Sequence, residues 1–89
     1  MTQRVYRVEY VRQAERELAE LPRRDQARVA EKINALARNP RPRGVKKLAG
    51  AESLYRLRVG EYRVVYEIRD RVLLILVVRV AHRREVYRK

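Results

Sequence analysis

The chain has 89 residues, and 23 Lys and Arg against 11 Asp and Glu give it a formal net charge of +12. This length suits one domain, residues 1–89, with a thin core, because a chain of this size buries only roughly 60–65% of its unfolded surface. The charge favours a polyanionic partner, since neutralising phosphates releases condensed counterions. The absence of cysteine excludes disulfides and thiol nucleophiles, and a single histidine argues against a metal cluster, so we expect no cofactor.

No membrane or export segment is expected. The N-terminus lacks the apolar stretch of a secretory signal, and the longest apolar run, residues 72–78, is too short to span a bilayer. We therefore expect a cytoplasmic protein.

The first half of the chain changes from strand to helix periodicity. Residues 5–10 carry apolar or aromatic side chains at every second position, which predicts a strand. Apolar residues then fall at helical spacing, which predicts helices over 11–21 and 22–38, the second with Pro22 in its first turn. Residues 39–44 contain two prolines and a glycine, and they are expected to end the helix and lead into a sheet.

The second half is strand-rich. An ambiguous stretch at 45–50 is followed by three strand-like runs at 54–59, 62–69 and 72–80. Gly60-Glu61 predicts a two-residue hairpin turn in which glycine supplies a positive φ, and Asp70-Arg71 is a weaker turn of the same length. The last run is apolar on both faces, as in a central strand. The order β-α-α-β-β-β predicts an α+β domain: an antiparallel sheet of about four strands, two helices on one face and a short C-terminal tail or helix.

The predicted hairpin gathers arginines on one face. With this turn, Arg58 lies opposite Arg63, and strand alternation adds Arg56 and Glu67 to the same side. Like charges directly opposite each other destabilise a sheet by a few tenths of a kcal/mol or more, unless an anion lies between them. Such a local conflict is where a functional site is expected, although a solvated face with splayed arginines fits the pattern as well.

The last strand is expected to place apolar side chains beside these arginines. Leu74, Leu76 and Val78 alternate onto the same face of the sheet. An exposed apolar patch needs a cover, which the tail or a segment of a partner protein would supply.

The tail, HRREVYRK, holds a tyrosine among cations. Tyr87 is surrounded by Arg83, Arg84, Arg88 and Lys89. Nearby cations favour the phenolate and lower a pKa that is ordinarily about 10, so Tyr87 is a candidate general base. A packing role for its ring is the alternative, and His82 is more readily a structural or phosphate-contacting residue than a base.

These residues together resemble the RelE/ParE superfamily of type II toxins. The resemblance covers nearly the whole chain: a strand and helix pair ending in an N-P loop, then KKLAG, then LYRLRVGEYRVVYEI, then an apolar strand leading into VAHRREVYR. Members of the RelE type are ribosome-dependent ribonucleases that cut mRNA in the ribosomal A site. The resemblance implies the same metal-free reaction here, in which a 2′-hydroxyl attacks the adjacent phosphate.

The resemblance also implies site residues. The paired strand cations of the family match Arg56 and Arg58, the cation of the G-x-Y-R stretch matches Arg63, and the tail cation and tyrosine match Arg83 and Tyr87. Arg63 and Arg56 would hold the phosphate, and Arg58 would support Tyr87 or the phosphate. Tyr87 would accept the 2′ proton, and Arg83 would stabilise or protonate the leaving 5′ oxygen. Arginine essentially does not deprotonate, so the base role rests on Tyr87. Further contacts to RNA or the ribosome are expected from Lys46, Lys47, His82, Arg84, Arg88 and Lys89, and Arg84 could exchange roles with Arg83.

Partners and alternatives follow from the same resemblance. It implies a cognate antitoxin whose acidic or amphipathic segment wraps the basic face, in a hetero-oligomeric complex, together with the ribosome and mRNA as targets. The first alternative is a ParE-like inhibitor of DNA gyrase without nuclease activity. The second is a non-toxic RNA-binding module or a decayed toxin.

Overall fold

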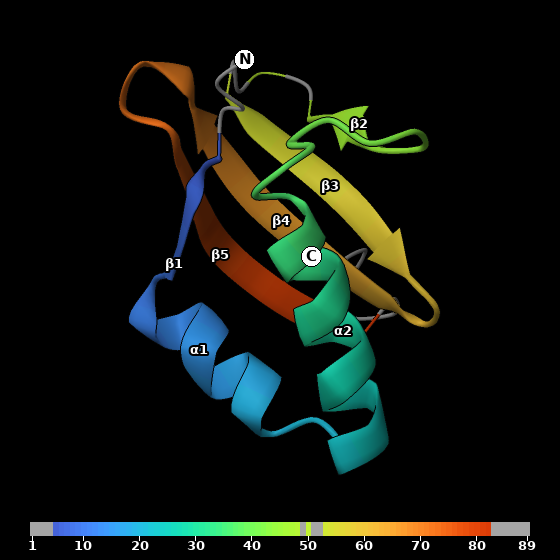
Figure 1. The fold of residues 1–89 in the computed structure, drawn as a ribbon. Helices are drawn as coiled ribbons and strands as arrows, with labels where there is room; N and C mark the ends of the chain where they lie inside the picture. The colour runs from blue at the N-terminus through green and yellow to red at the C-terminus, as the bar shows by residue number, and fades with distance from the viewer. Residues whose placement is uncertain (1–4, 49, 51–52, 83–89) are drawn as a thin grey trace.

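The computed structural model describes residues 5–48, 50 and 53–82. Two helices pack on one face of a single sheet (Figure 1). The elements are β1 (Arg7–Tyr10), α1 (Arg12–Ala19), α2 (Arg23–Ala35), β2 (Lys46–Lys47), β3 (Leu54–Val59), β4 (Tyr62–Arg69), the 3₁₀ turn η1 (Asp70–Val72) and β5 (Leu74–His82). The predicted α+β architecture is confirmed.

The sheet has one more strand than predicted, in the order β1-β5-β4-β3-β2. β2 is a two-residue strand in the ambiguous stretch, and it pairs antiparallel with β3. β1 runs parallel to β5, so the sheet is antiparallel as expected except at that edge. β5 lies between β1 and β4, which confirms that the run apolar on both faces is an inner strand.

Both helices are shorter than their apolar patterns. Val11 is not helical, because its extended backbone donates to the carbonyl of Val77 at 3.0 Å and so continues the contact of β1 with β5. α2 ends at Ala35, beyond which the backbone closes into tighter turns before the prolines.

The turn between β4 and β5 also differs from the prediction. The two-residue turn at Asp70-Arg71 is replaced by the 3₁₀ turn η1 and by Leu73 in the left-handed region, with a φ of 51°. The longer turn delays the start of the last strand to Leu74, and that strand continues to His82.

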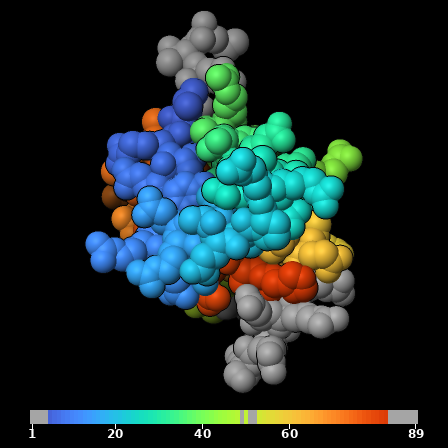
Figure 2. Space-filling view, turned by 90° about the horizontal axis from the view of Figure 1, so that it is seen from below, coloured from blue at the N-terminus to red at the C-terminus, as the bar shows by residue number. Residues whose placement is uncertain are grey.

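The core fills the layer between the sheet and the helices. Figure 2 shows α1 and α2 side by side, with the end of β5 reaching the surface beside them. The largest fully buried side chains come from α2, the turn after it, β4 and β5: Val29, Ile33, Leu36, Val64, Tyr66, Ile75, Val77 and Val80. Within the described residues, no helix is long and apolar enough to cross a membrane.

One side chain of α1 completes the hydrogen bonding of β5. β1 covers the outer edge of β5 only as far as Val77. Beyond it, Glu17 accepts a hydrogen bond from the backbone N–H of Val80 at 2.7 Å and pairs with Arg79 at 2.9 Å. α1 is thereby tied to the strand edge.

Candidate functional site

The β3–β4 hairpin has the register that the sequence predicts. Val59 lies opposite Tyr62 and Arg58 opposite Arg63. Gly60 has the expected positive φ, 58°, and a Cβ at that position would lie 3.0 Å from Nη2 of Arg28. The positive φ favours glycine at this turn, whereas the exposed end of the Arg28 side chain is flexible enough to make room for a Cβ. The turn also sets which side chains share a face.

Four cations gather on the face of the sheet away from the helices. Leu57 and Val64 face the core, so alternation places Arg56, Arg58 and Arg63 on the other side. β2 adds Lys46, which is paired with Arg56. These four side chains and Gly44 line a hollow of about 310 Å³, here called the basic hollow.

The basic hollow combines buried and accessible charge. Arg63 is only 5% exposed, Arg56 is half-buried and Arg58 is exposed. No carboxylate is among the described residues that line it. Guanidinium groups bind phosphate oxygens through paired hydrogen bonds, and partial burial strengthens such contacts by lowering the local dielectric. The arrangement is suited to holding a phosphate and to stabilising extra negative charge on it.

Two other predicted contact residues lie elsewhere. Lys47 pairs with Tyr55, so alternation turns it away from the face that carries Lys46. His82 pairs with Tyr62 across β4 and β5, and the two rings meet edge to face at 5.7 Å. His82 lines a separate pocket with Glu17, at the α1 side of the sheet. The structure does not bring these two residues into the basic hollow.

The predicted tail residues lie outside the described residues. They are Arg83, Arg84, Tyr87, Arg88 and Lys89.

A longer turn before β5 and a β-bulge within β5 together displace the expected apolar patch. In the β4–β5 ladder, Val65 pairs with Arg79 and Tyr66 with Val77, which leaves Val78 as an extra residue. The extra residue reverses the alternation of β5, so Arg63 faces Ala81. Leu76 and Leu74 lie between the bulge and the turn before β5. Because that turn is longer than predicted, Arg69 pairs with Leu74 and Glu67 with Leu76, which moves both leucines farther along the sheet. The prediction that Leu74, Leu76 and Val78 flank the arginine cluster is therefore wrong in position.

The hairpin tyrosines belong to the helix side of the sheet. Tyr62 donates a hydrogen bond to Asp25 at 2.8 Å, and Tyr66 donates one to the carbonyl of Pro40 at 2.7 Å. The hydrogen bond to Asp25 raises the pKa of Tyr62, and burial raises the pKa of Tyr66. Neither phenol faces the basic hollow, and both hold their protons too strongly to act as a base near neutral pH.

One lining residue was not singled out from the sequence. Gly44, with a φ of 92°, forms part of the wall of the basic hollow. The Pro-Arg-Gly ending of the loop before β2 is a signal for such a turn. The described residues contain no group of three or more His, Cys, Asp or Glu side chains that could hold a metal ion.

Comparison with known proteins gives a consistent result. A family model described as "ParE toxin of type II toxin-antitoxin system, parDE" matches residues 8–87. The chain is 36% identical over 88 residues to the toxin RelG of Mycobacterium tuberculosis, with 94% of this chain and 98% of the relative covered.

Two solved toxin–antitoxin complexes contain a chain with the same fold. One is the complex RelBE2 from Mycobacterium tuberculosis, with 33% identity, a TM-score of 0.80, and 92% of this chain and 95% of that chain covered. The other is the archaeal RelE–RelB complex from Pyrococcus horikoshii, with 33% identity, a TM-score of 0.79, and 89% and 96% covered.

Proposed function

The chain belongs to the RelE/ParE superfamily of type II toxins, and we propose that it is a ribosome-dependent endoribonuclease that cuts mRNA in the ribosomal A site. The observation that carries the proposal is the basic hollow, where Lys46, Arg56, Arg58 and Arg63 converge without a lining carboxylate among the described residues. A scissile phosphate is the ligand that best fits such a site.

The proposed reaction needs positioning and charge stabilisation. The ribose 2′-oxygen attacks the adjacent phosphorus, the bond from phosphorus to the 5′ oxygen breaks, and a 2′,3′-cyclic phosphate remains. Arg63 and Arg56 hold the phosphate, and Arg58 supports them. The shielded position of Arg63 supports this role, since a preorganised cation at low dielectric stabilises developing charge with little reorganisation.

Proton transfer is assigned to the tail. Tyr87, as the phenolate, accepts the proton of the 2′-hydroxyl. Arg83 or Arg84 stabilises the leaving 5′ oxygen, which takes up a proton from water. The described hairpin tyrosines support this assignment indirectly, because Tyr62 and Tyr66 lie on the other face of the sheet and have raised pKa values.

The surrounding cations complete the proposed RNA interface. Lys46 shares the basic hollow, and Arg88 and Lys89 extend the interface from the tail. Lys47 and His82 would contact the ribosome from other surfaces, since neither lines the hollow.

The proposed partner is a cognate antitoxin. The two solved relatives described above are toxin–antitoxin complexes. A net charge of +12 favours a partner with an acidic segment, and we expect a hetero-oligomer that acts in the cytoplasm, where ribosomes and mRNA are found.

Cleavage of mRNA on purified ribosomes tests the proposal. Arg63→Ala and Tyr87→Phe should each lower the rate by about 100-fold or more, because each removes a charge-stabilising or proton-accepting group. Arg24→Ala, at an exposed position of α2, is the matched control and should cut normally. Far-ultraviolet circular dichroism checks that each variant is folded. Unchanged cutting by both site variants would refute the proposed site.

A second candidate function is inhibition of DNA gyrase without nuclease activity. The family model that matches this chain carries the ParE name. Supercoiling by gyrase with added protein separates the two functions: blocked supercoiling together with intact mRNA would select gyrase inhibition.

A further inference from the structure

The proline loop, residues 39–44, leads from α2 to the wall of the basic hollow. Its last residue, Gly44, lines the hollow, and Lys46 of β2 follows two positions later and lines it as well. β2 is a two-residue strand at the edge of the sheet. Such a short strand orders little backbone by itself, so the position of Lys46 depends on what holds the loop before it.

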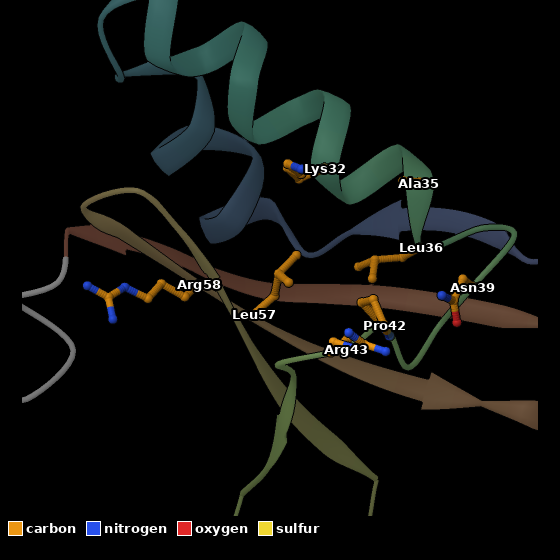
Figure 3. A pocket seen from close by; sticks show the side chains of 8 residues that line it. All are labelled: Lys32, Ala35, Leu36, Asn39, Pro42, Arg43, Leu57 and Arg58. Atoms are coloured by element: carbon orange, nitrogen blue, oxygen red, sulfur yellow. The ribbon is translucent and has the colours of Figure 1, made fainter.

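Packing beneath the proline loop leaves space. A concavity of about 280 Å³ lies between the C-terminal end of α2, the loop and β3. Figure 3 shows Pro42 beside Leu36, with Leu57 farther along the concavity and the side chain of Arg58 directed away from the other residues. Leu36 is fully buried, but Pro42 and Leu57 are only half-buried. Apolar contacts therefore leave the loop room to move toward or away from β3.

Polar contacts of Arg41 fasten the loop. Its guanidinium group pairs with Asp70 of η1, with Nη2 at 3.0 Å from Oδ2 and Nη1 at 3.5 Å from Oδ1. Nε donates a hydrogen bond to Oη of Tyr55 at 3.3 Å, and Cζ lies 5.3 Å from the centre of that ring. Asp70 also accepts a hydrogen bond from Tyr6. We call Arg41, Asp70, Tyr55 and Tyr6 the Arg41 clamp.

The Arg41 clamp joins parts of the chain that are far apart. Arg41 lies 14 positions before Tyr55 of β3 and 29 before Asp70. Next to it, the carbonyl of Pro40 accepts a hydrogen bond from Tyr66 of β4 at 2.7 Å, and the Tyr66 ring stacks on Tyr55. An exposed ion pair alone contributes little, whereas a two-pronged pair within a network holds one geometry. The start of the loop is thereby fixed to three elements of the fold.

The turn at the end of the loop passes this position on to the basic hollow. The N–H of Val45 donates to the carbonyl of Pro42 at 3.2 Å, and Gly44 within that turn has a φ of 92°. Two residues separate Arg41 from Gly44, and one of them is a proline with a fixed φ. A segment this short and stiff transmits a shift of Arg41 to Gly44 and Lys46.

We propose that Arg41 is a positioning residue, whose clamp with Asp70 and Tyr55 holds Gly44 and Lys46 where they complete the phosphate site of the basic hollow. The proposal rests on the proposed function for the identity of the ligand, a phosphate of the RNA substrate. It adds a group outside the hollow that sets how well the hollow binds, because a wall held in place needs no ordering when the phosphate arrives.

Removing the anionic member of the clamp separates positioning from charge. Asp70→Asn breaks the ion pair and raises the formal net charge from +12 to +13. Attraction by net charge alone predicts tighter binding of RNA, whereas loss of the clamp predicts weaker binding. Glu31→Gln is the matched control, because it removes one carboxylate from an exposed position of α2.

The first measurement is the affinity for a short fluorescent 2′-O-methyl RNA, which cannot be cut. Asp70→Asn and Arg41→Gln should each weaken binding by about fivefold, and Glu31→Gln should stay within about twofold of the wild type. The chain with both clamp substitutions should bind like either single variant, since all three lack the same contact.

A second comparison distinguishes positioning from a loss of stability. In the wild type, Lys46→Ala should weaken RNA binding by about fivefold. In the Asp70→Asn chain it should weaken binding by less than about twofold, because Lys46 is no longer held at the phosphate. A merely destabilised chain would show the full effect of Lys46→Ala in both backgrounds. Thermal unfolding followed by circular dichroism checks that each variant is folded at the assay temperature.

Two results would overturn the clamp. One is unchanged or tighter RNA binding by Asp70→Asn, and the other is an equal effect of Lys46→Ala with and without Asp70→Asn. The proposed function is judged separately, on the wild type. A wild type that neither binds RNA nor cuts mRNA on ribosomes would contradict that function, whereas a wild type that does both and is matched by Asp70→Asn would contradict the clamp alone.

Discussion

The pair formed by Arg58 and Arg63 leads to a quantitative prediction. The two residues face each other directly across β3 and β4, one exposed and one only 5% exposed. If the two side chains repel each other, Arg58→Gln should raise the free energy of unfolding more in the wild type than in a chain that already carries Arg63→Gln. The difference between the two effects is the coupling energy of the pair.

The size of the coupling energy follows from the direct pairing of Arg58 with Arg63 and from the exposure of Arg58. Directly opposed side chains on neighbouring strands interact by roughly 0.2–1 kcal/mol, and the exposure of Arg58 places this pair near the middle of that range. A coupling of about 0.5 kcal/mol shifts the midpoint of urea unfolding by about 0.5 M, with a slope of about 1 kcal/mol per molar for a small domain.

Urea unfolding of the four proteins in the cycle measures the coupling. It should be present at low ionic strength and shrink toward zero in 1 M NaCl, where the screening length falls to about 3 Å. Inorganic phosphate should reduce it at constant ionic strength, because an anion between the guanidinium groups removes their repulsion. A coupling of zero or of opposite sign at low salt would refute the reasoning and favour a solvated face with splayed side chains.

Three further predictions concern the elements that position the site, each measured as a free energy of unfolding. Gly60→Ala should cost about 1–2 kcal/mol, because a left-handed φ of 58° strains an L-residue; an unchanged midpoint would contradict this account of the turn. Tyr62→Phe should cost about 1 kcal/mol by removing the hydrogen bond to Asp25. The pKa of Tyr62 is raised in the folded protein, so its hydrogen bond should contribute fully to the free energy of unfolding below pH 10, about the pKa of tyrosine in the unfolded chain. The contribution should be lost as the pH rises through the folded pKa. A destabilisation by Tyr62→Phe that stays constant at higher pH would contradict this account. Glu17→Ala should cost about 1–3 kcal/mol, because the N–H of Val80 loses its acceptor; a cost near zero would show that water replaces the carboxylate.

Local signals predicted the hairpin and the arginine cluster. Gly60-Glu61 marks the turn, and a two-residue turn determines the register, so the approach of Arg58 to Arg63 follows from chain-local chemistry. The core positions of Tyr62 and Tyr66 follow from the same alternation.

Features that depend on distant parts of the chain were not predictable in this way. The parallel contact of β1 with β5 joins residues far apart in sequence, and no local pattern specifies which edge β1 occupies. The bulge at Val78 falls in a run that is apolar on both faces, so an extra residue leaves no mark in the hydrophobic pattern. The concavity between the C-terminal end of α2, the proline loop and β3 combines a helix, a loop and a strand, and it exists only once they pack.

The contact of Glu17 with the end of β5 also bears on self-association. Beyond Val77, β1 no longer covers this strand, and an uncovered strand edge can pair with the edge of another molecule. The carboxylate of Glu17 occupies the N–H of Val80, and Arg79 adds a charge at the same place. A second copy that added a strand there would have to displace that hydrogen bond and bury both charges. A single side chain of α1 thus disfavours the pairing of a second strand at this end of β5.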